Sequence, residues 1–178
     1  MHVYLVGYRG TGKSTIGRML SARLQMPCVD CDDLVEQSAG RSIREIFDEE
    51  GEVSFRDREQ SAIQQLAESA EEHPRVVALG GGAVLREANR VAVSSSGYRI
   101  WLTATPTTIL QRIQDDPTTA RRRPALSALS DYEEIVSMLA AREPLYASIA
   151  QKIVDTESVT AEAMIDNIVD WLKSAGAT

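Results

Sequence analysis

The fold of this chain is decided near its start, by the sequence His2-Val-Tyr-Leu-Val-Gly7-Tyr-Arg-Gly-Thr-Gly12-Lys13-Ser14. Residues 2–6 form an apolar run that ends at a glycine, which suits a buried strand of a parallel sheet. Residues 7–14 match the pattern G-x-x-x-x-G-K-S, and apolar residues then recur at helical spacing up to Gln25. A strand, a glycine-rich turn and a helix in this order are the context that a phosphate-binding loop requires.

The chemistry expected of this loop follows from its glycines and its lysine. The glycines let successive backbone N–H groups converge on phosphate oxygens, and the start of the helix adds its dipole. We expect Lys13 to reach the β- and γ-phosphates of ATP and Ser14 to ligate Mg²⁺. The alternative, a chance glycine-rich turn, is disfavoured by the full match in this context. The residues of the loop expected to bind ATP are Gly10, Thr11, Gly12, Lys13, Ser14 and Thr15.

The rest of the chain alternates between strands and helices. Strands are expected at residues 2–6, 28–30, 75–79, 98–102 and 152–154. A first helix is expected at residues 13–25, a short second one over residues 34–35 that ends at residue 40, and a third from residue 42 to near residue 51. Further helices are expected at about residues 53–72, 85–93, 105–113, 132–146 and 161–173. This alternation predicts an α/β sandwich around a parallel sheet, with ligands at the carboxyl ends of the strands.

Length and composition indicate one globular domain over residues 1–178. The hydrophobic fraction of 43% and the charged fraction of 25% are ordinary for a soluble protein. A net charge of −7 argues against a nucleic-acid partner, which needs a basic face, and no apolar run approaches the length of a membrane span. Residues 115–127 are polar, flanked by prolines and rich in arginine, and we expect them to form a lid within the domain.

The two cysteines, Cys28 and Cys31, have a C-x-x-C spacing that favours no metal site. A zinc site needs two further ligands, and His2 and His73 lie far away in no ligand spacing. We interpret the cysteines as small apolar residues in or beside a strand rather than as a redox pair. The expected compartment is therefore the reducing cytoplasm.

Three carboxylates follow the second expected strand, at Asp30, Asp32 and Asp33. A carboxylate at the strand tip beside the phosphate-binding loop can hold Mg²⁺, through water in the case of Asp30. Asp32 lies two residues further on, on the same side of an extended chain, and can accept a proton from an attacking hydroxyl. The alternative is that these residues only cap the next helix, with Asp32 or Asp33 at its start.

A phosphate-binding loop is shared by kinases, GTPases, motors and switches. The guanine-selecting pattern N-K-x-D is absent, and the chain is short for a motor. Length and the small sheet therefore favour a kinase that acts on a small molecule.

Further motifs make this chain resemble the shikimate kinase family. They agree with that family in order and spacing and cover about residues 2–172. The motifs are Asp30-x-Asp32, Gly40-Arg-Ser-Ile-Arg-Glu-Ile-Phe47, Gly51-Glu-x-x-Phe55-Arg56-x-x-Glu59, Gly80-Gly-Gly82 and Arg142-x-Pro-Leu-Tyr146. The resemblance implies a three-layer α/β fold with strand order 2-3-1-4-5, use of MgATP, and transfer to the 3-hydroxyl of shikimate.

The resemblance also implies roles for individual residues. Asp32 would bind the acceptor hydroxyls and serve as a candidate base, while Arg56 and Arg142 would grip the substrate carboxylate. The substrate pocket would be completed by Gly80, Gly81 and Gly82 and lined or braced by Phe47, Phe55 and Glu59. Arg112 would lie near the adenine, and a lid arginine would act on the phosphates, Arg123 being favoured over Arg121 and Arg122.

The chemistry of the arginines agrees with these roles, although each has a plainer alternative. A planar guanidinium binds a carboxylate through two hydrogen bonds. Arg56 could instead be a surface arginine paired with Glu52 or Glu59, and Arg142 could form an ordinary ion pair on a helix. Other functions weighed are a different small-metabolite kinase, such as a gluconate kinase, and a non-catalytic nucleotide-binding module. The expected partners are ATP and shikimate, with no nucleic acid or membrane, and the chain is expected to be a monomer.

Overall fold

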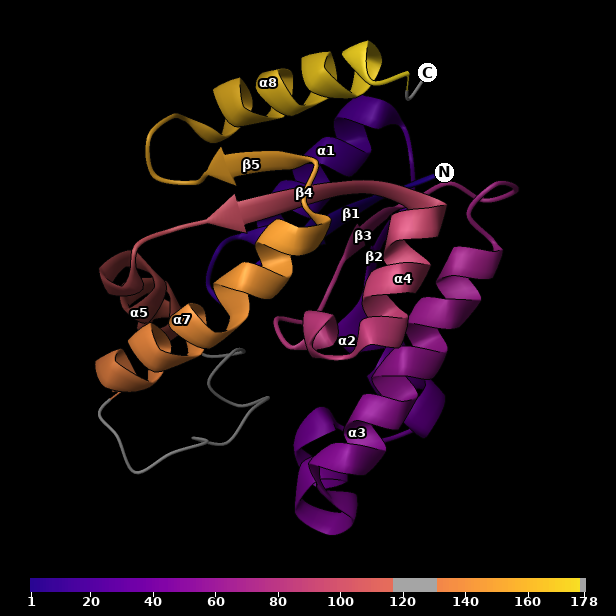
Figure 1. The fold of residues 1–178 in the computed structure, drawn as a ribbon, viewed down its shortest axis with the longest axis vertical. Coiled ribbons are helices and arrows are strands. Elements are labelled where there is room, and N and C mark those ends of the chain that lie inside the picture. Colours follow the sequence, from indigo (N-terminus) through magenta and orange to yellow (C-terminus); the bar gives the residue numbers. More distant parts are fainter. Residues whose placement is uncertain (117–130, 177–178) are drawn as a thin grey trace.

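The computed structural model describes residues 1–116 and 131–176. These residues form a parallel sheet of five strands in the order β2-β3-β1-β4-β5, which confirms the predicted order (Figure 1). The strands are β1 His2–Val6, β2 Cys28–Asp30, β3 Val76–Ala78, β4 Gly97–Thr103 and β5 Lys152–Asp155.

Helices cover both faces of this sheet (Figure 1). They are α1 Lys13–Leu24, α2 Cys31–Ala39, α3 Ile43–Glu68, α4 Glu87–Ser96, α5 Pro106–Asp115, α7 Asp131–Ile149 and α8 Ala161–Ser174, with a short 3-10 turn at Ala83–Leu85. The central strand β1 shows how the layers form. Its residues Val3 and Leu5 pack in a cluster with apolar residues of α1 and α8, while Tyr4 and Val6 pack in another with residues of α3, α4 and α7. Alternate side chains of one strand therefore build the two cores of a three-layer sandwich.

The strand register brings the chemically important segments together. In β1, Leu5 is paired with Ala78 of β3, and Ala78 is in turn paired with Asp30 of β2. The segments that leave the carboxyl ends of these strands are the phosphate-binding loop, the Gly80–Gly82 loop and the start of α2. The sheet thus places all three at one edge, as expected for a ligand site of an open α/β sheet.

Two predicted helix starts are confirmed. At Ser42 the hydroxyl accepts a hydrogen bond from the backbone of Glu45, whose carboxylate accepts from the Ser42 N–H at 2.7 Å, a capping box. Thr105 accepts from the backbone of Thr108, with Pro106 at the first helical position of α5.

The start of α2 differs from the prediction. Its N-cap is Asp30, whose carboxylate accepts a hydrogen bond from the N–H of Asp32 at 3.0 Å. Neither Asp32 nor Asp33 is the cap, because the chain turns into the helix directly after Asp30. Asp32 therefore lies in the first helical turn, and the argument from an extended chain was wrong.

Other boundaries shift by a few residues. The expected break near Gly51 is present as a non-helical residue with φ 81° inside α3. That helix ends at Glu68 rather than near residue 72, and α4 begins at Glu87, after the 3-10 turn, rather than near residue 85.

The expected lid lies largely outside the described residues. Asp115 ends α5 and Asp116 follows it, whereas Arg121, Arg122 and Arg123 belong to the segment that is not described. None of the helices in residues 1–116 and 131–176 is long and apolar enough to cross a membrane.

Candidate active site

A cavity of about 840 Å³ opens at the carboxyl edge of the sheet. Its lining combines the phosphate-binding loop, the acidic start of α2, the first glycines after β3, and residues of α5 and α8. Among its residues are Arg9, Gly10, Thr11, Gly12, Lys13, Ser14, Thr15, Asp30, Asp32, Asp33, Gly80, Gly81, Arg112 and Thr156. The predicted nucleotide residues of the loop thus share one cavity with Asp32, Gly80 and Gly81, and its size suits small ligands. The other predicted acceptor residues, Arg56, Gly82 and Arg142, do not line it.

The phosphate-binding loop needs its glycines. Gly10 and Gly12 have φ angles of 78° and 88°, in the left-handed region that side chains rarely adopt. Gly12 is also the residue that caps α1, so the loop runs directly into the start of the helix. The loop backbone and the helix N-terminus therefore form an anion-binding site.

Lys13 is nearly buried, and its ammonium group lies inside the curl of the loop. Its Nζ donates hydrogen bonds to the carbonyl oxygens of Gly7 at 2.8 Å and Tyr8 at 2.7 Å. Its positive charge is therefore held at the site where the loop would hold phosphate oxygens.

Ser14 and Asp30 lie together in the lining of the cavity. The Ser14 hydroxyl donates to Asp30 Oδ2 at 2.8 Å. Burial raises the pKa of the Asp30 carboxyl, and the neighbouring charge of Asp32 raises this pKa further. Hydroxyl and carboxylate oxygens are the ligands that Mg²⁺ prefers, and a cation here would relieve the crowded negative charge.

Within the described part of the chain, no three histidine, cysteine or acidic side chains gather into a group that could hold a metal. Neither cysteine lines the cavity. Cys31 is fully buried and packs in the apolar cluster with Ile63 and Val77, as its interpretation as a small apolar residue requires.

Arg56, on α3, lies against the Gly80–Gly82 loop. A Cβ atom built on Gly82 would lie only 2.7 Å from the Cζ atom of Arg56. Arg56 is held there by Glu59 at 2.8 Å and Glu52 at 3.0 Å. Burial alone would lower its pKa, but the two carboxylates outweigh this effect and raise it. The ion pairs proposed as the alternative role of Arg56 are therefore present, and they aim its guanidinium at the loop.

Arg142, on α7, reaches the same loop from the other side. Its Nη1 donates to the carbonyl oxygen of Gly81 at 3.3 Å, and its Cζ lies 5.6 Å from the ring centre of Tyr8. The hydroxyl of Tyr146, one turn further along α7, also donates to the Gly81 carbonyl. The two predicted carboxylate-binding arginines thus contact adjacent glycines of one loop.

Arg112 lines the cavity next to the phosphate-binding loop. It donates to the hydroxyl and carbonyl oxygens of Thr156 at 2.8 and 3.0 Å, and to the carbonyl of Gly10 at 3.4 Å. The neighbouring Glu157 accepts hydrogen bonds from the backbone N–H and hydroxyl of Thr105, at 2.7 and 2.9 Å, and from the hydroxyl of Thr108. These hydroxyl and N–H donors lower the pKa of Glu157.

The structure also contains site residues that the sequence did not indicate. Glu157 fastens the segment after β5 to the start of α5, and Arg9 of the phosphate-binding loop pairs with Glu134 of α7 at 3.0 Å. The residues of each pair lie far apart in the sequence, and no motif marks them. Arg123 lies outside the described residues.

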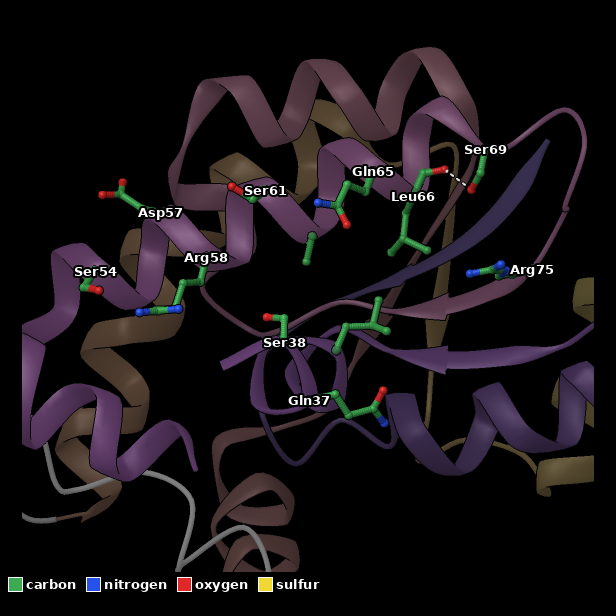
Figure 2. Close-up of a pocket in the computed structure, with 12 residues that line it drawn as sticks. Gln37, Ser38, Ser54, Asp57, Arg58, Ser61, Gln65, Leu66, Ser69 and Arg75 are labelled. Carbon is green, nitrogen blue, oxygen red and sulfur yellow. Dashed lines mark hydrogen bonds between the residues drawn. The ribbon is translucent and has the colours of Figure 1, made fainter. Parts of the chain in front are cut away.

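A second hollow, of about 930 Å³, lies between α2 and α3 (Figure 2). Most of the residues that line it are of polar types, including Gln37 and Ser38 of α2 and Arg58 and Ser61 of α3. Arg58 is paired with Glu50 at 3.0 Å. No residue predicted to bind ATP or substrate lines this groove, so the cavity at the phosphate-binding loop is the candidate active site.

A loop built for nucleotide phosphates faces a second loop that two arginines reach from α3 and α7. A phosphotransferase with a small anionic acceptor needs such an arrangement, and the molecule is a small-molecule P-loop kinase.

A family model described as shikimate kinase matches residues 9–173. The shikimate kinase of Rhodopirellula baltica is 44% identical over 168 residues, covering 94% of this chain and 88% of that protein. That of Symbiobacterium thermophilum is 39% identical over 176 residues, covering 99% and 98%. The chain belongs to the shikimate kinase family and is an ATP-dependent phosphotransferase.

Solved structures agree with this assignment to the shikimate kinase family. Shikimate kinase from Acinetobacter baumannii, in complex with shikimate, superposes with a TM-score of 0.87 at 32% identity, covering 98% of this chain and 93% of that one. Shikimate kinase from Aquifex aeolicus gives 0.77 at 27% identity, with 99% of each chain covered. A gluconokinase from Sinorhizobium meliloti gives 0.56 at 14% identity, covering 98% and 92%, and shares the fold alone. A gluconate kinase is therefore not the favoured reading.

Proposed function

We propose that this member of the shikimate kinase family transfers the γ-phosphoryl group of ATP to the 3-hydroxyl of shikimate, giving shikimate 3-phosphate and ADP. The observation that carries the proposal is the meeting of Arg56 and Arg142 at adjacent glycines of one loop, beside the phosphate-binding loop. A gluconate kinase would not need this combination, and a non-catalytic module would not need to keep the phosphate and acceptor groups together.

On the nucleotide side, the loop backbone and Lys13 bind the β- and γ-phosphates. Lys13 exchanges hydrogen bonds with loop carbonyls for phosphate oxygens, which lie at the same curl of the backbone. Ser14 and Asp30 would hold Mg²⁺, Asp30 through water, and a bound Mg²⁺ would neutralise charge on the phosphate oxygens. Arg112 supports the adenine side through Thr156. The role of Arg123 on the phosphates stays a prediction from the resemblance.

On the acceptor side, Arg56 and Arg142 bind the carboxylate of shikimate through paired N–H donors. Backbone groups of Gly80 and Gly81 approach the ring closely because no Cβ intervenes. Asp32 lines the same cavity and accepts a hydrogen bond from the hydroxyl that attacks. The new bond joins that oxygen to the γ-phosphorus, the bond from this phosphorus to ADP breaks, and the hydroxyl proton leaves toward Asp32.

We propose that the enzyme works in the cytoplasm. The free thiols of Cys28 and Cys31 and the biosynthetic character of the family support this compartment. A single-domain monomer over residues 1–178 stays a prediction.

The proposal is tested by the variant Asp32→Asn, with Asp48→Asn as the matched control. Asp48 lies on the exposed part of α3, paired with Arg44. Because a positioned acid–base group contributes about 10²–10⁴-fold, we expect kcat to fall by about that factor in Asp32→Asn with ATP affinity unchanged. NMR of the product of the unmodified enzyme should place the phosphate on the 3-oxygen. Unchanged turnover in Asp32→Asn, or a phosphate on another oxygen, would contradict the proposal.

A further inference from the structure

Arg9 lies at the junction between the nucleotide side and the acceptor side of the cavity. It belongs to the phosphate-binding loop and lines the cavity together with Lys13, Gly80 and Gly81. Its backbone nitrogen is only 3.1 Å from the position that a Cβ atom on Gly81 would take. The Arg9 side chain therefore starts where the phosphate-binding loop meets the Gly80–Gly82 loop.

Glu134 fixes the direction of this side chain. The Nη2 of Arg9 donates to Glu134 Oε1 at 3.0 Å, and the side chains of the two residues are 21% and 4% exposed. The Cζ of Arg9 also lies 5.7 Å from the ring centre of Tyr8. A pair this well buried, between a loop and α7, holds a guanidinium in one orientation much better than a surface pair would.

The ion pair does not use all the donors of Arg9. A guanidinium has N–H groups on three nitrogens, and Glu134 accepts from Nη2. Within residues 1–116 and 131–176, the Nε–H of Arg9 is buried and has no hydrogen-bond partner. The guanidinium as a whole is 21% exposed and borders the cavity, so its N–H groups beyond those that bind Glu134 fit an anion brought by the ligand.

We propose that Arg9 is a further phosphate-binding residue, which contacts the γ-phosphoryl group during transfer, and that Glu134 is the positioning residue that holds it. The proposal rests on the proposed function, because it assigns a role within the same site. A fixed cation at the junction of donor and acceptor stabilises the charge on the phosphoryl oxygens without reorganisation during the reaction.

The first test measures nucleotide binding without shikimate. In Arg9→Gln, the affinity for ATP should fall about 10-fold or more relative to the affinity for ADP, since only ATP carries the γ-phosphate. Arg23→Gln is the matched control, because Arg23 forms an exposed ion pair with Asp166. If Arg9 had a purely structural role, the substitution would lower the affinities for ATP and ADP by the same factor. Equal losses, or no loss, would overturn the proposal.

The second test separates Arg9 from its ion pair. The double variant Arg9→Glu with Glu134→Arg rebuilds the pair with its charges exchanged. We expect kcat to stay at least about 100-fold below the unmodified enzyme, the size typical of a lost transition-state donor, with the Tm largely recovered relative to each single variant. Recovery of kcat by the exchange would overturn the proposal, because the pair would then act only as a brace.

A third variant covers the case in which Arg9→Gln or the exchanged pair does not fold. Glu134→Gln keeps the guanidinium and a neutral acceptor, and it should lower kcat while leaving the KM for shikimate within about threefold. An unchanged kcat, or an effect confined to the KM for shikimate, would overturn the positioning role.

If the proposed function itself fails, the unmodified protein will bind ATP but release no ADP with shikimate. The ATP-to-ADP affinity ratio is measured without shikimate and stays informative.

Discussion

The guanidinium of Arg56 occupies the space that a side chain at Gly82 would need, with Cζ 2.7 Å from the ideal Cβ position. The backbone of Gly82 has φ −101°, which any residue adopts, so backbone strain does not require this glycine. A side chain at this position would instead have to displace the guanidinium of Arg56. Helix α3 and the Gly80–Gly82 loop are therefore packed together, and we propose that they form one wall of the acceptor site.

The variant Gly82→Ala tests this relationship. The new methyl group should displace the Arg56 guanidinium and weaken its bond to the substrate carboxylate. A charged hydrogen bond contributes about 1.5–3 kcal/mol, so the KM for shikimate should rise about 10–100-fold with the KM for ATP unchanged. Steady-state kinetics with each substrate varied measures both.

Arg56→Ala provides the control for this prediction. If the methyl group acts through Arg56, the double variant should be no worse than Arg56→Ala alone. Additive losses would show that the alanine disturbs the loop in some other way.

The raised pKa of Asp30 leads to the prediction that one substitution at this residue lowers activity without lowering thermal stability. Burial raises its pKa in the folded protein, so its stabilising contribution is present below the unfolded pKa and is lost as pH rises through the folded value. At pH 7 the Asp30 charge therefore opposes folding. Asn can replace Asp as the N-cap of α2, so the metal-free, nucleotide-free variant Asp30→Asn should have a Tm at least equal to that of the unmodified protein.

The activity of Asp30→Asn should fall by about 10–100-fold, because the site loses a carboxylate near the metal. Thermal unfolding without ligands and kcat over a range of Mg²⁺ concentrations measure the two effects. A marked drop in Tm would contradict the inference that the Asp30 charge opposes folding.

His2 predicts a loss of stability in mild acid. Its ring is fully buried, with Nδ1 accepting from the N–H of Arg75 at 3.0 Å and Nε2 bonded to the carbonyl of Leu66 at 2.7 Å. Burial lowers its pKa from 6.5. The unfolded chain therefore takes up a proton first, and stability that is present above pH 6.5 is lost as pH falls toward the folded value.

Urea unfolding at pH 7.5 and pH 5.5 measures this effect. The free energy of unfolding should fall by up to about 1.4 kcal/mol per pH unit through His2, and the variant His2→Asn should remove that share of the pH dependence. His73 is exposed, so His73→Asn should keep the dependence. The same dependence in His2→Asn and in the unmodified protein would be inconsistent with the buried neutral ring.

The contacts of Glu157 lead to the prediction that its removal changes the KM for ATP but not the KM for shikimate. Its carboxylate holds the segment after β5 against Thr105 and Thr108, next to the Thr156 that Arg112 binds. Removing it in Glu157→Ala should loosen this wall and raise the KM for ATP about 5-fold, the size of one lost hydrogen bond, with the KM for shikimate unchanged. Glu162→Ala, an exposed change in the first turn of α8, is the control. Equal changes in both KM values would argue against a local effect.

Local patterns predicted much of this fold. The phosphate-binding loop, the capping box at Ser42 and the Thr105-Pro106 helix start are short motifs whose hydrogen bonds close within a few residues. The alternation of strands and helices predicted the layers, and the family resemblance supplied the strand order.

The remaining features depend on contacts that no local pattern encodes. Asp30 was assigned to the metal but not to the helix start, because several acids stand next to one another and only the backbone decides which one caps. The Arg9–Glu134 and Thr105–Glu157 contacts join residues far apart in the sequence. Arg56 was predicted from the family resemblance, but its contact with Gly82 depends on how α3 packs against the loop.

The central claim is tested most directly by ADP formation from MgATP, measured with shikimate, with gluconate and without an acceptor. We predict that shikimate alone produces a large rise in ADP, and that Arg142→Ala reduces this rise mainly through the KM for shikimate. No rise with shikimate, in a protein that demonstrably binds ATP, would contradict the account.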